Sequence, residues 1–289
     1  MSRASYVGGN EGNTLQSGGG ARYGPLVNVG AGNRTPASDA HRRPRYPRPV
    51  AAPVLAVLHN LEHAFTGHAG PPLRAAGVEL DERRLWHGDP LPALDEVDGI
   101  LSFGGDQSVR GIGDDPVLEA EAALLRDAVG RSVPVLGVCL GAQLLAHALG
   151  GSVSRLPRRF VAWAPIEPLP AAAGDPVLGA LPPGAFALHW NEDGFELPSG
   201  AVELLRRPAG TVEGFRVGER AWGVQFHPEV DPDALDGWYR DGYMELSEAG
   251  VTEEQARAAD ARHLPGQRAL SDALFGGFAR VVAARPVAA

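Results

Sequence analysis

Four short, continuous apolar runs constrain the fold of this chain more than any other feature. They occupy residues 54–58, 99–103, 133–138 and 222–226, and each is typical of a strand buried on both faces. Helical periodicity fills the stretches 115–130 and 140–149. Strands that alternate with helices form a mainly parallel sheet, so we predict an α/β fold whose open sheet is covered by helices on both faces.

The first fifty of the 289 residues differ from the rest in composition. Residues 1–50 are rich in glycine, serine, asparagine and proline, and carry seven arginines against Glu11 and Asp39. Without apolar periodicity this segment is predicted to be a disordered tail, with a transit peptide or a nucleic-acid-binding arm as the alternatives. Residues 51–289 are predicted to form one domain with a helical C-terminal extension from about residue 231.

Charge and composition argue against several classes of function. The net charge is −9 although residues 1–50 are net positive, so the body of the chain is acidic and nucleic acid is not expected as a partner. The chain has no lysine, which excludes a phosphate-binding-loop lysine and Schiff-base chemistry. No apolar run reaches about eighteen residues and no secretory signal is evident, so we expect a cytoplasmic protein without a membrane partner.

The single cysteine, Cys139, lies in the pentapeptide Gly-Val-Cys-Leu-Gly at residues 137–141. A glycine on each side of a central nucleophile, after a strand and before a helix, is the pattern of a nucleophile elbow. The N-terminus of the following helix favours a thiolate, which is the reactive form. The alternative is a buried, inert thiol at a strand end. One cysteine excludes an intramolecular disulfide and a multi-cysteine zinc site.

The sequence Phe-His-Pro-Glu follows the last apolar run and supplies a base and a carboxylate. His227 precedes Pro228 and is therefore biased to extended geometry, in which residues i and i+2 point the same way. Glu229 could then hold one ring nitrogen of His227 while the other takes the thiol proton. A surface turn is the alternative, but together with the elbow we predict a triad of Cys139, His227 and Glu229.

Glycines at the end of the second apolar run indicate a site for an oxyanion. The N–H groups of Gly105, in the pair Gly104-Gly105, and of Leu140 could hold a tetrahedral oxyanion. Other candidates are weaker: His59, His63 and His68 lie where a strand becomes a loop, and His147 inside the elbow helix is interpreted as a packing or surface residue. We expect no metal and no organic cofactor.

These motifs resemble the class I glutamine amidotransferases, most closely the stand-alone proteins similar to the amidotransferase domain of GMP synthetase. The resemblance runs from about residue 54 to the C-terminus and rests on residues 104–109, 133–146, 189–195 and 223–229. It implies a flavodoxin-like layering, and it implies that Gln143 contacts substrate. It also implies that a loop containing Trp190, Glu192 and Asp193 binds the substrate's amino and carboxylate groups, largely through backbone.

Two residues depart from the family pattern. Asp106 stands where many relatives have proline, and Asn191 stands where close relatives often have histidine. Asp106 would add negative charge near the predicted oxyanion site.

The resemblance implies hydrolysis of the side-chain amide of L-glutamine through a thioester on Cys139, which yields glutamate and ammonia. The sixty residues after Glu229 are too few for an ATP-using domain, so we expect a separate synthetase or acceptor subunit to use the ammonia. The first alternative is a γ-glutamyl hydrolase that acts on γ-glutamyl amines or peptides. A pocket closed around the amide nitrogen would favour glutamine, and an open one a larger amine. The alternative of another class is a non-catalytic binding subunit.

Overall fold

The computed structural model describes residues 52–62, 66–208 and 210–284. The predicted N-terminal tail at residues 1–50 lies outside the described residues. All four apolar runs form strands, and the predicted α/β fold with a mainly parallel sheet is confirmed.

The main sheet has eight strands among the described residues. Its order is β2 (Glu79–Arg84), β1 (Val54–His59), β3 (Gly99–Ser102), β4 (Val135–Val138), β10 (Ala221–Val224), β9 (Val212–Val217), β8 (Val202–Arg206) and β6 (Glu167–Pro168). Neighbours from β2 to β10 are parallel, and the remaining pairs are antiparallel. The carboxyl ends of β1, β3, β4 and β10 therefore meet at one edge of the sheet.

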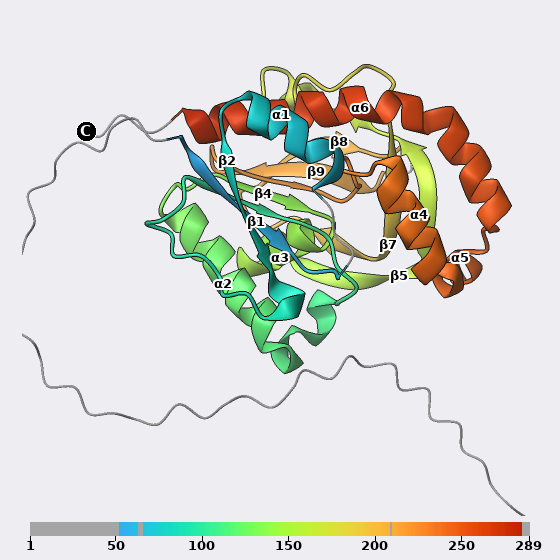
Figure 1. Ribbon diagram of the computed structural model, residues 1–289, viewed down its shortest axis with the longest axis horizontal. Helices are drawn as coiled ribbons and strands as arrows, with labels where there is room; N and C mark the ends of the chain where they lie inside the picture. Colours follow the sequence, from blue (N-terminus) through green and yellow to red (C-terminus); the bar gives the residue numbers. More distant parts are fainter. Residues whose placement is uncertain (1–51, 63–65, 209, 285–289) are drawn as a thin grey trace, which may run out of the picture. The chain divides into compact units, whose positions relative to one another are not determined.

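Helices cover both faces of this sheet, as Figure 1 shows. One face carries α2 (Pro116–Gly130) and α3 (Leu140–Ala148), and the other carries α1 (Gly70–Ala75) and α6 (Glu253–Ala283). Side chains of β1 alternate between the two cores: Leu55 and Val57 pack on one side, and Ala56 and Leu58 on the other. This alternation follows from the two-residue period of a strand, and it explains why the strand is apolar throughout.

The helix borders follow from local capping chemistry. Asp115 accepts hydrogen bonds from the backbone N–H groups of Val117 and Leu118, and Pro116 occupies the first position of α2. At the start of α6, the side chains and backbone of Thr252 and Gln255 form a reciprocal capping box. These caps satisfy N–H groups that the first turn of a helix leaves without partners.

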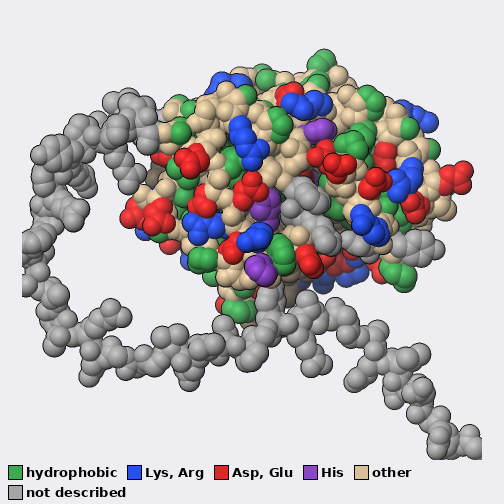
Figure 2. Space-filling model, in the orientation of Figure 1, with side chains coloured by type: hydrophobic (Ala, Val, Ile, Leu, Met, Phe, Trp, Pro, Cys, Tyr) green, Lys and Arg blue, Asp and Glu red, His purple; other side chains and the backbone are tan. Residues whose placement is uncertain are grey.

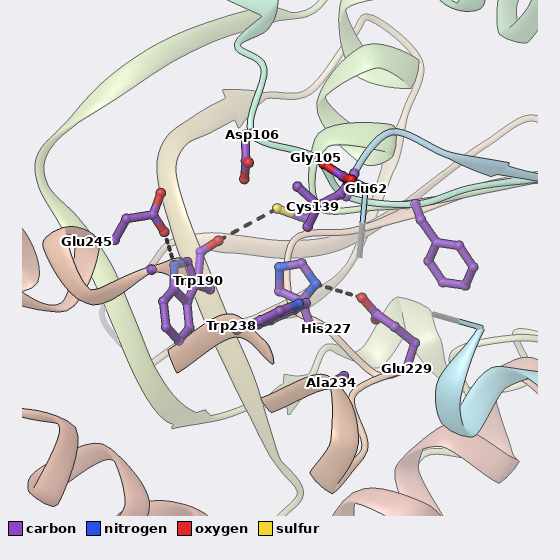
Figure 3. Close-up of a pocket in the computed structure, with 14 residues that line it drawn as sticks. Glu62, Gly105, Asp106, Cys139, Trp190, His227, Glu229, Ala234, Trp238 and Glu245 are labelled. Atoms are coloured by element: carbon purple, nitrogen blue, oxygen red, sulfur yellow. Dashed lines mark hydrogen bonds and ion pairs between the residues drawn. The ribbon is translucent and has the colours of Figure 1, made fainter. Parts of the chain in front are cut away.

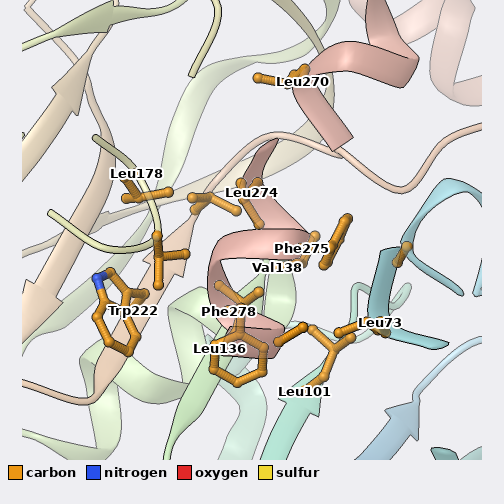
Figure 4. Close-up of a cluster of buried hydrophobic side chains, with 14 of the residues drawn as sticks. Leu73, Leu101, Leu136, Val138, Leu178, Trp222, Leu270, Leu274, Phe275 and Phe278 are labelled. Atoms are coloured by element: carbon orange, nitrogen blue, oxygen red, sulfur yellow. The ribbon is translucent and has the colours of Figure 1, made fainter. Parts of the chain in front are cut away.

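The longest helix, α6, closes the core on one face. Phe275 and Phe278 are fully buried, and Figure 4 shows them beside Leu136, Val138 and Trp222 of the sheet. Burying each such ring contributes about 1.5–3 kcal/mol. Two further helices, α4 (Pro232–Asp241) and α5 (Tyr243–Ala249), precede α6. In the part of the chain that the structure describes, no helix is both long and apolar enough to cross a membrane.

A second, antiparallel sheet stands beside the first. Its two strands are β5 (Ser152–Pro165) and β7 (Phe186–Glu196). The prediction of a loop at residues 190–193 is wrong, because Trp190 pairs with Val161 and Asn191 with Phe160 inside this ladder. On the face drawn in Figure 2, acidic and basic side chains are interspersed, and hydrophobic ones are scattered among them.

Candidate active site

A pocket of about 320 Å³ lies at the carboxyl edge of the parallel strands, where ligands bind in sheets of this kind. Cys139 follows β4, Gly104 and Gly105 follow β3, and His227 follows β10. The sequence places these residues far apart, and the sheet brings them together. The pocket lining includes the three residues of the predicted triad together with Leu61, Glu62, Phe103, Gly104, Gly105, Asp106, Trp190, Ala234, Trp238, Gly242 and Glu245 (Figure 3).

Cys139 occupies the strained turn that the elbow pattern predicts. Its φ of 51° and ψ of −107° lie in a region that side chains rarely adopt. A Cβ added at Gly141 would lie 2.2 Å from the carbonyl oxygen of Ser102, and one at Gly137 would lie 2.5 Å from the backbone of Gly141. Only glycine therefore fits on either side of the turn. The sulfur lies at the N-terminus of α3, whose dipole favours a negative charge.

His227 and Glu229 lie side by side, as the extended geometry at Pro228 predicts. Nδ1 of His227 is 2.8 Å from Oε1 of Glu229, and both side chains are buried. The backbone N–H of His227 donates to the carbonyl oxygen of Leu188 over 2.8 Å, and its own carbonyl accepts from Gln267. These bonds fix the backbone of His227 on both sides. Its other ring nitrogen, Nε2, has no hydrogen-bond partner among the described residues.

The electrostatic surroundings keep the imidazole of His227 protonated at neutral pH. Burial alone would lower the pKa of His227, but the carboxylate of Glu229 and the nearby sulfur of Cys139 outweigh it and raise the pKa to about 10. His227 and Cys139 line the same pocket. The missing side chain at Gly104 makes this approach possible, because a Cβ there would lie 3.0 Å from Cε1 of His227.

Gly105 and Leu140 lie next to each other. A Cβ at Gly105 would be 2.9 Å from Cδ2 of Leu140, and Gly105 lines the pocket. Leu140 is the first residue of α3, so its backbone N–H belongs to the turn that has no partner within the helix. That the N–H groups of Gly105 and Leu140 hold an oxyanion stays a prediction.

A family model described as glutamine amidotransferase class-I matches residues 73–244, which is more than half of the chain. The chain belongs to the class I glutamine amidotransferase family. It is 29% identical over 199 residues to the glutamine amidotransferase-like protein YfeJ of Salmonella typhimurium, a match covering 66% of this chain and 83% of YfeJ.

Two further similarities agree with this assignment. One subunit of the glutamine-hydrolysing GMP synthase of Natronomonas pharaonis is 32% identical over 161 residues, which cover 55% of this chain and 78% of that polypeptide. The crystal structure of a glutamine amidotransferase from Methylobacillus flagellatus superposes with a TM-score of 0.69 at 28% identity, over 80% of this chain and 95% of that one. Family and fold therefore agree.

Of the four residues predicted to bind substrate, Trp190 alone lines the pocket. Gln143 is buried, and its Nε2 donates to the carbonyl oxygen of Asp193 over 3.1 Å and to Oε1 of Gln225 over 3.2 Å. Glu192 and Asp193 form ion pairs with Arg110, at 3.3 and 2.9 Å. These three residues bond to other groups of the protein and do not line the pocket, and their contact with substrate stays a prediction.

Gln225 lies close to the sulfur, although none of the sequence motifs singles it out. Its Nε2 donates to Sγ of Cys139 over 3.6 Å, while its Oε1 accepts from Gln143. A sequence signal exists, because Gln225 comes two residues before His227 in an otherwise apolar strand end.

A cluster of buried polar side chains packs against the loop that contains Gly104 and Gly105. Oγ of Ser102 donates to Glu121 over 2.6 Å, and Nδ2 of Asn60 lies 3.4 Å from both Glu121 and the carbonyl oxygen of Phe103. Burial raises the pKa of Glu121 to about 7. Asn60 touches the loop directly, since a Cβ at Gly105 would lie 2.8 Å from Cβ of Asn60. Glu121 occupies a core-facing position of α2, so helical periodicity gives no hint of its polar contacts.

The weaker histidine candidates have other surroundings. His59 stacks on Phe103, with ring centroids 5.5 Å apart, and its Nε2 is 3.3 Å from Glu82. His147 is exposed on α3, as a surface residue, and His63 lies outside the described residues. Within residues 52–62, 66–208 and 210–284, no group of three or more His, Cys, Asp or Glu side chains is placed to hold a metal ion.

Proposed function

We propose that this chain hydrolyses the side-chain amide of L-glutamine with Cys139 as nucleophile, His227 as acid and base, and Glu229 as the carboxylate that orients His227. The observation that carries the proposal is the elbow at Cys139 beside an imidazole whose Nδ1 lies 2.8 Å from Glu229. Membership of the class I glutamine amidotransferase family supports the same chemistry.

The reaction begins with attack of the Cys139 thiolate on the δ-carbonyl carbon of glutamine. The carbonyl oxygen becomes an anion and accepts hydrogen bonds from the N–H groups of Gly105 and Leu140. The carbon–nitrogen bond then breaks, and the imidazolium of His227 gives its proton to the nitrogen, which leaves as ammonia. His227 next takes a proton from water, the resulting hydroxide opens the thioester, and glutamate leaves.

We further propose that the ammonia passes to a separate synthetase subunit. The match in Natronomonas pharaonis is one of the separate subunits of a glutamine-hydrolysing GMP synthase, and this supports a division of the two reactions between polypeptides. Co-purification of the chain with an ATP-using synthetase would test this partnership.

A second candidate function is supported by the size of the pocket. Its volume is about 320 Å³, and Trp190, Trp238 and Glu245 line it together with Cys139. A pocket of this size would also suit γ-glutamyl amines or peptides, in which the amide nitrogen carries a larger group. A non-catalytic binding subunit is the third alternative, and it predicts that Cys139→Ser leaves the cellular role intact.

The test is to offer the purified chain L-glutamine and a set of neutral γ-glutamyl amides, and to identify the products by mass spectrometry. Release of glutamate and ammonia from glutamine, lost in Cys139→Ala, supports the amidotransferase. Hydrolysis of the amides with glutamine untouched supports the hydrolase instead. No turnover of any substrate, with no adduct on Cys139, refutes both.

A further inference from the structure

Glu121 on α2 is a fully buried carboxylate that does not line the pocket. We propose that Glu121 is a positioning residue of the active site. It fixes Asn60 and Ser102, and these two residues hold the backbone of the predicted oxyanion site in place. The inference rests on the proposed function, because the N–H groups of Gly105 and Leu140 are the donors to which that mechanism assigns the oxyanion.

The first line of contact runs through Asn60 to the glycine loop. Nδ2 of Asn60 lies 3.4 Å from Oε1 of Glu121 and 3.4 Å from the carbonyl oxygen of Phe103. The backbone carbonyl of Asn60 accepts a hydrogen bond of 3.1 Å from Nε2 of Gln107. Between these two bonds, Asn60 packs so closely that a Cβ added at Gly105 would lie 2.8 Å from its own Cβ. A shift of Asn60 is therefore transmitted to the glycine loop.

The second line of contact runs through Ser102 to the nucleophile elbow. Oγ of Ser102 donates to Oε1 of Glu121 over 2.6 Å, a length typical of a hydroxyl group bonded to an ionised carboxylate. A Cβ added at Gly141 would lie 2.2 Å from the carbonyl oxygen of Ser102 and 2.5 Å from its Oγ. Ser102 therefore packs directly against the first turn of α3, which begins at Leu140.

Both lines of contact start from the same carboxylate oxygen. Ser102 is the last residue of β3, and Asn60 follows the last residue of β1. These strands are neighbours in the sheet, with Ser102 paired to Leu58. One side chain from the helix layer thus sets the placement of the glycine loop relative to the elbow.

The carboxylate at position 121 lowers the stability of the fold. Burial raises the pKa of Glu121 to about 7 and Asp115 adds to the rise, although the hydrogen bonds from Ser102 and Asn60 oppose it. The ionised form is therefore less favoured in the folded chain than in the unfolded one. Oε2 of Glu121 and Oδ1 of Asn60 also have no hydrogen-bond partner among the described residues. A destabilising polar group in a core is typical of a residue that serves activity.

The experiment measures kcat and KM at pH 8, where the carboxylate is ionised, for the full chain and for Glu121→Gln. The substrate is L-glutamine, or the γ-glutamyl amide that the chain hydrolyses instead. The amide of Gln keeps the shape of the side chain and removes its charge, so both hydrogen bonds to Oε1 weaken. Loss of a whole oxyanion donor lowers kcat by about 10²–10³-fold, and we expect the weakened support to lower it by about tenfold.

Two further readouts separate positioning from a structural role. KM should change by less than about twofold, because the oxyanion forms only after binding. Urea unfolding at pH 8 should show Glu121→Gln to be more stable than the unsubstituted chain. A lower kcat in a more stable protein indicates positioning, whereas a purely structural role predicts an unchanged kcat.

Alkylation of Cys139 by iodoacetamide tests the route of the effect. This reaction needs the sulfur but forms no oxyanion, so its rate should be the same in Glu121→Gln and in the unsubstituted chain. Glu121→Leu removes both hydrogen-bond acceptors and should lower kcat further. A matched control, Glu119→Gln, removes the same charge from an exposed position of α2 and should leave kcat, KM and stability unchanged.

Three results overturn the proposal. If the unsubstituted chain is active and Glu121→Gln keeps its kcat, the role of Glu121 is structural and the proposed function stands. If kcat and the alkylation rate fall together, the carboxylate acts on the nucleophile and not on the oxyanion site. If the unsubstituted chain hydrolyses neither glutamine nor any γ-glutamyl amide, the proposed function fails and the inference fails with it.

Discussion

Substituting Gly105 by alanine tests the assignment of the oxyanion site. The added Cβ would lie 2.4 Å from Oε1 of Gln107, 2.8 Å from Cβ of Asn60 and 2.9 Å from Cδ2 of Leu140. The Gln107 side chain ends in a group that can rotate away. Asn60 and Leu140 are both buried, so the glycine loop itself has to move.

The movement takes the N–H of residue 105 away from the position of the oxyanion. Loss of one such donor lowers kcat by about 10²–10³-fold. KM for glutamine should change little, because the donor acts mainly in the transition state. Overpacking of this kind also destabilises a protein by about 1–3 kcal/mol, which urea unfolding would measure.

A matched control is available in the same loop region. Gly111 has a φ of −104°, and a Cβ there meets nothing within 4 Å. Gly111→Ala should therefore keep both kcat and stability. If Gly105→Ala is folded and retains the kcat of the unsubstituted chain, the backbone of Gly105 does not stabilise the oxyanion and that part of the reasoning is refuted.

Three other substitutions follow from the same contacts. Glu229→Gln should lower kcat by about 10²–10⁴-fold and shift the alkaline limb of the pH–rate profile below pH 10, because the carboxylate raises the pKa of His227. In the unsubstituted chain, protonated His227 contributes its full share of the free energy of unfolding below about pH 6.5, and this share is lost as the pH rises towards 10. Urea unfolding should show this decline, and Glu229→Gln should reduce it. Glu121→Gln should stabilise the fold by up to about 3 kcal/mol at pH 8 and have little effect near pH 4.5, because the carboxyl group ionises near pH 4.5 in the unfolded chain and near pH 7 when buried. Equal urea-unfolding curves of the variant and the unsubstituted chain at pH 8 would contradict this prediction. Arg159→Met should speed amide hydrogen exchange in α5, because Glu245 and Glu248 lose their common counterion; unchanged exchange would mean that the pairs do not hold the helix.

The features that could be predicted from the sequence are those with local causes. The apolar runs that form β1, β3, β4 and β10 are strands because burial on both faces excludes polar side chains. The elbow at Cys139 and the pairing of His227 with Glu229 depend on residues next to each other in the chain. Glycine chemistry and the proline bias are sufficient to predict both.

The features that could not be predicted depend on contacts between distant segments. Residues 190–193 carry no strand signal of their own and become part of β7 because β5 supplies the partner ladder. Gln143 is one turn from the nucleophile, but its direction is set by Asp193 and Gln225. None of the sequence motifs includes Trp238, and this residue becomes part of the pocket through the position of α4.

The central claim is that Cys139 is a nucleophile directed at the side-chain carbonyl of a glutamyl substrate. The most direct measurement is covalent labelling of the purified chain by an electrophilic glutamine analogue, followed by intact mass and peptide mapping. We predict one adduct, located on Cys139, absent from Cys139→Ala, slower in Glu229→Gln and suppressed by excess L-glutamine. An unlabelled protein, or an adduct on Cys139 that forms equally fast in Glu229→Gln and in the presence of glutamine, would contradict the account.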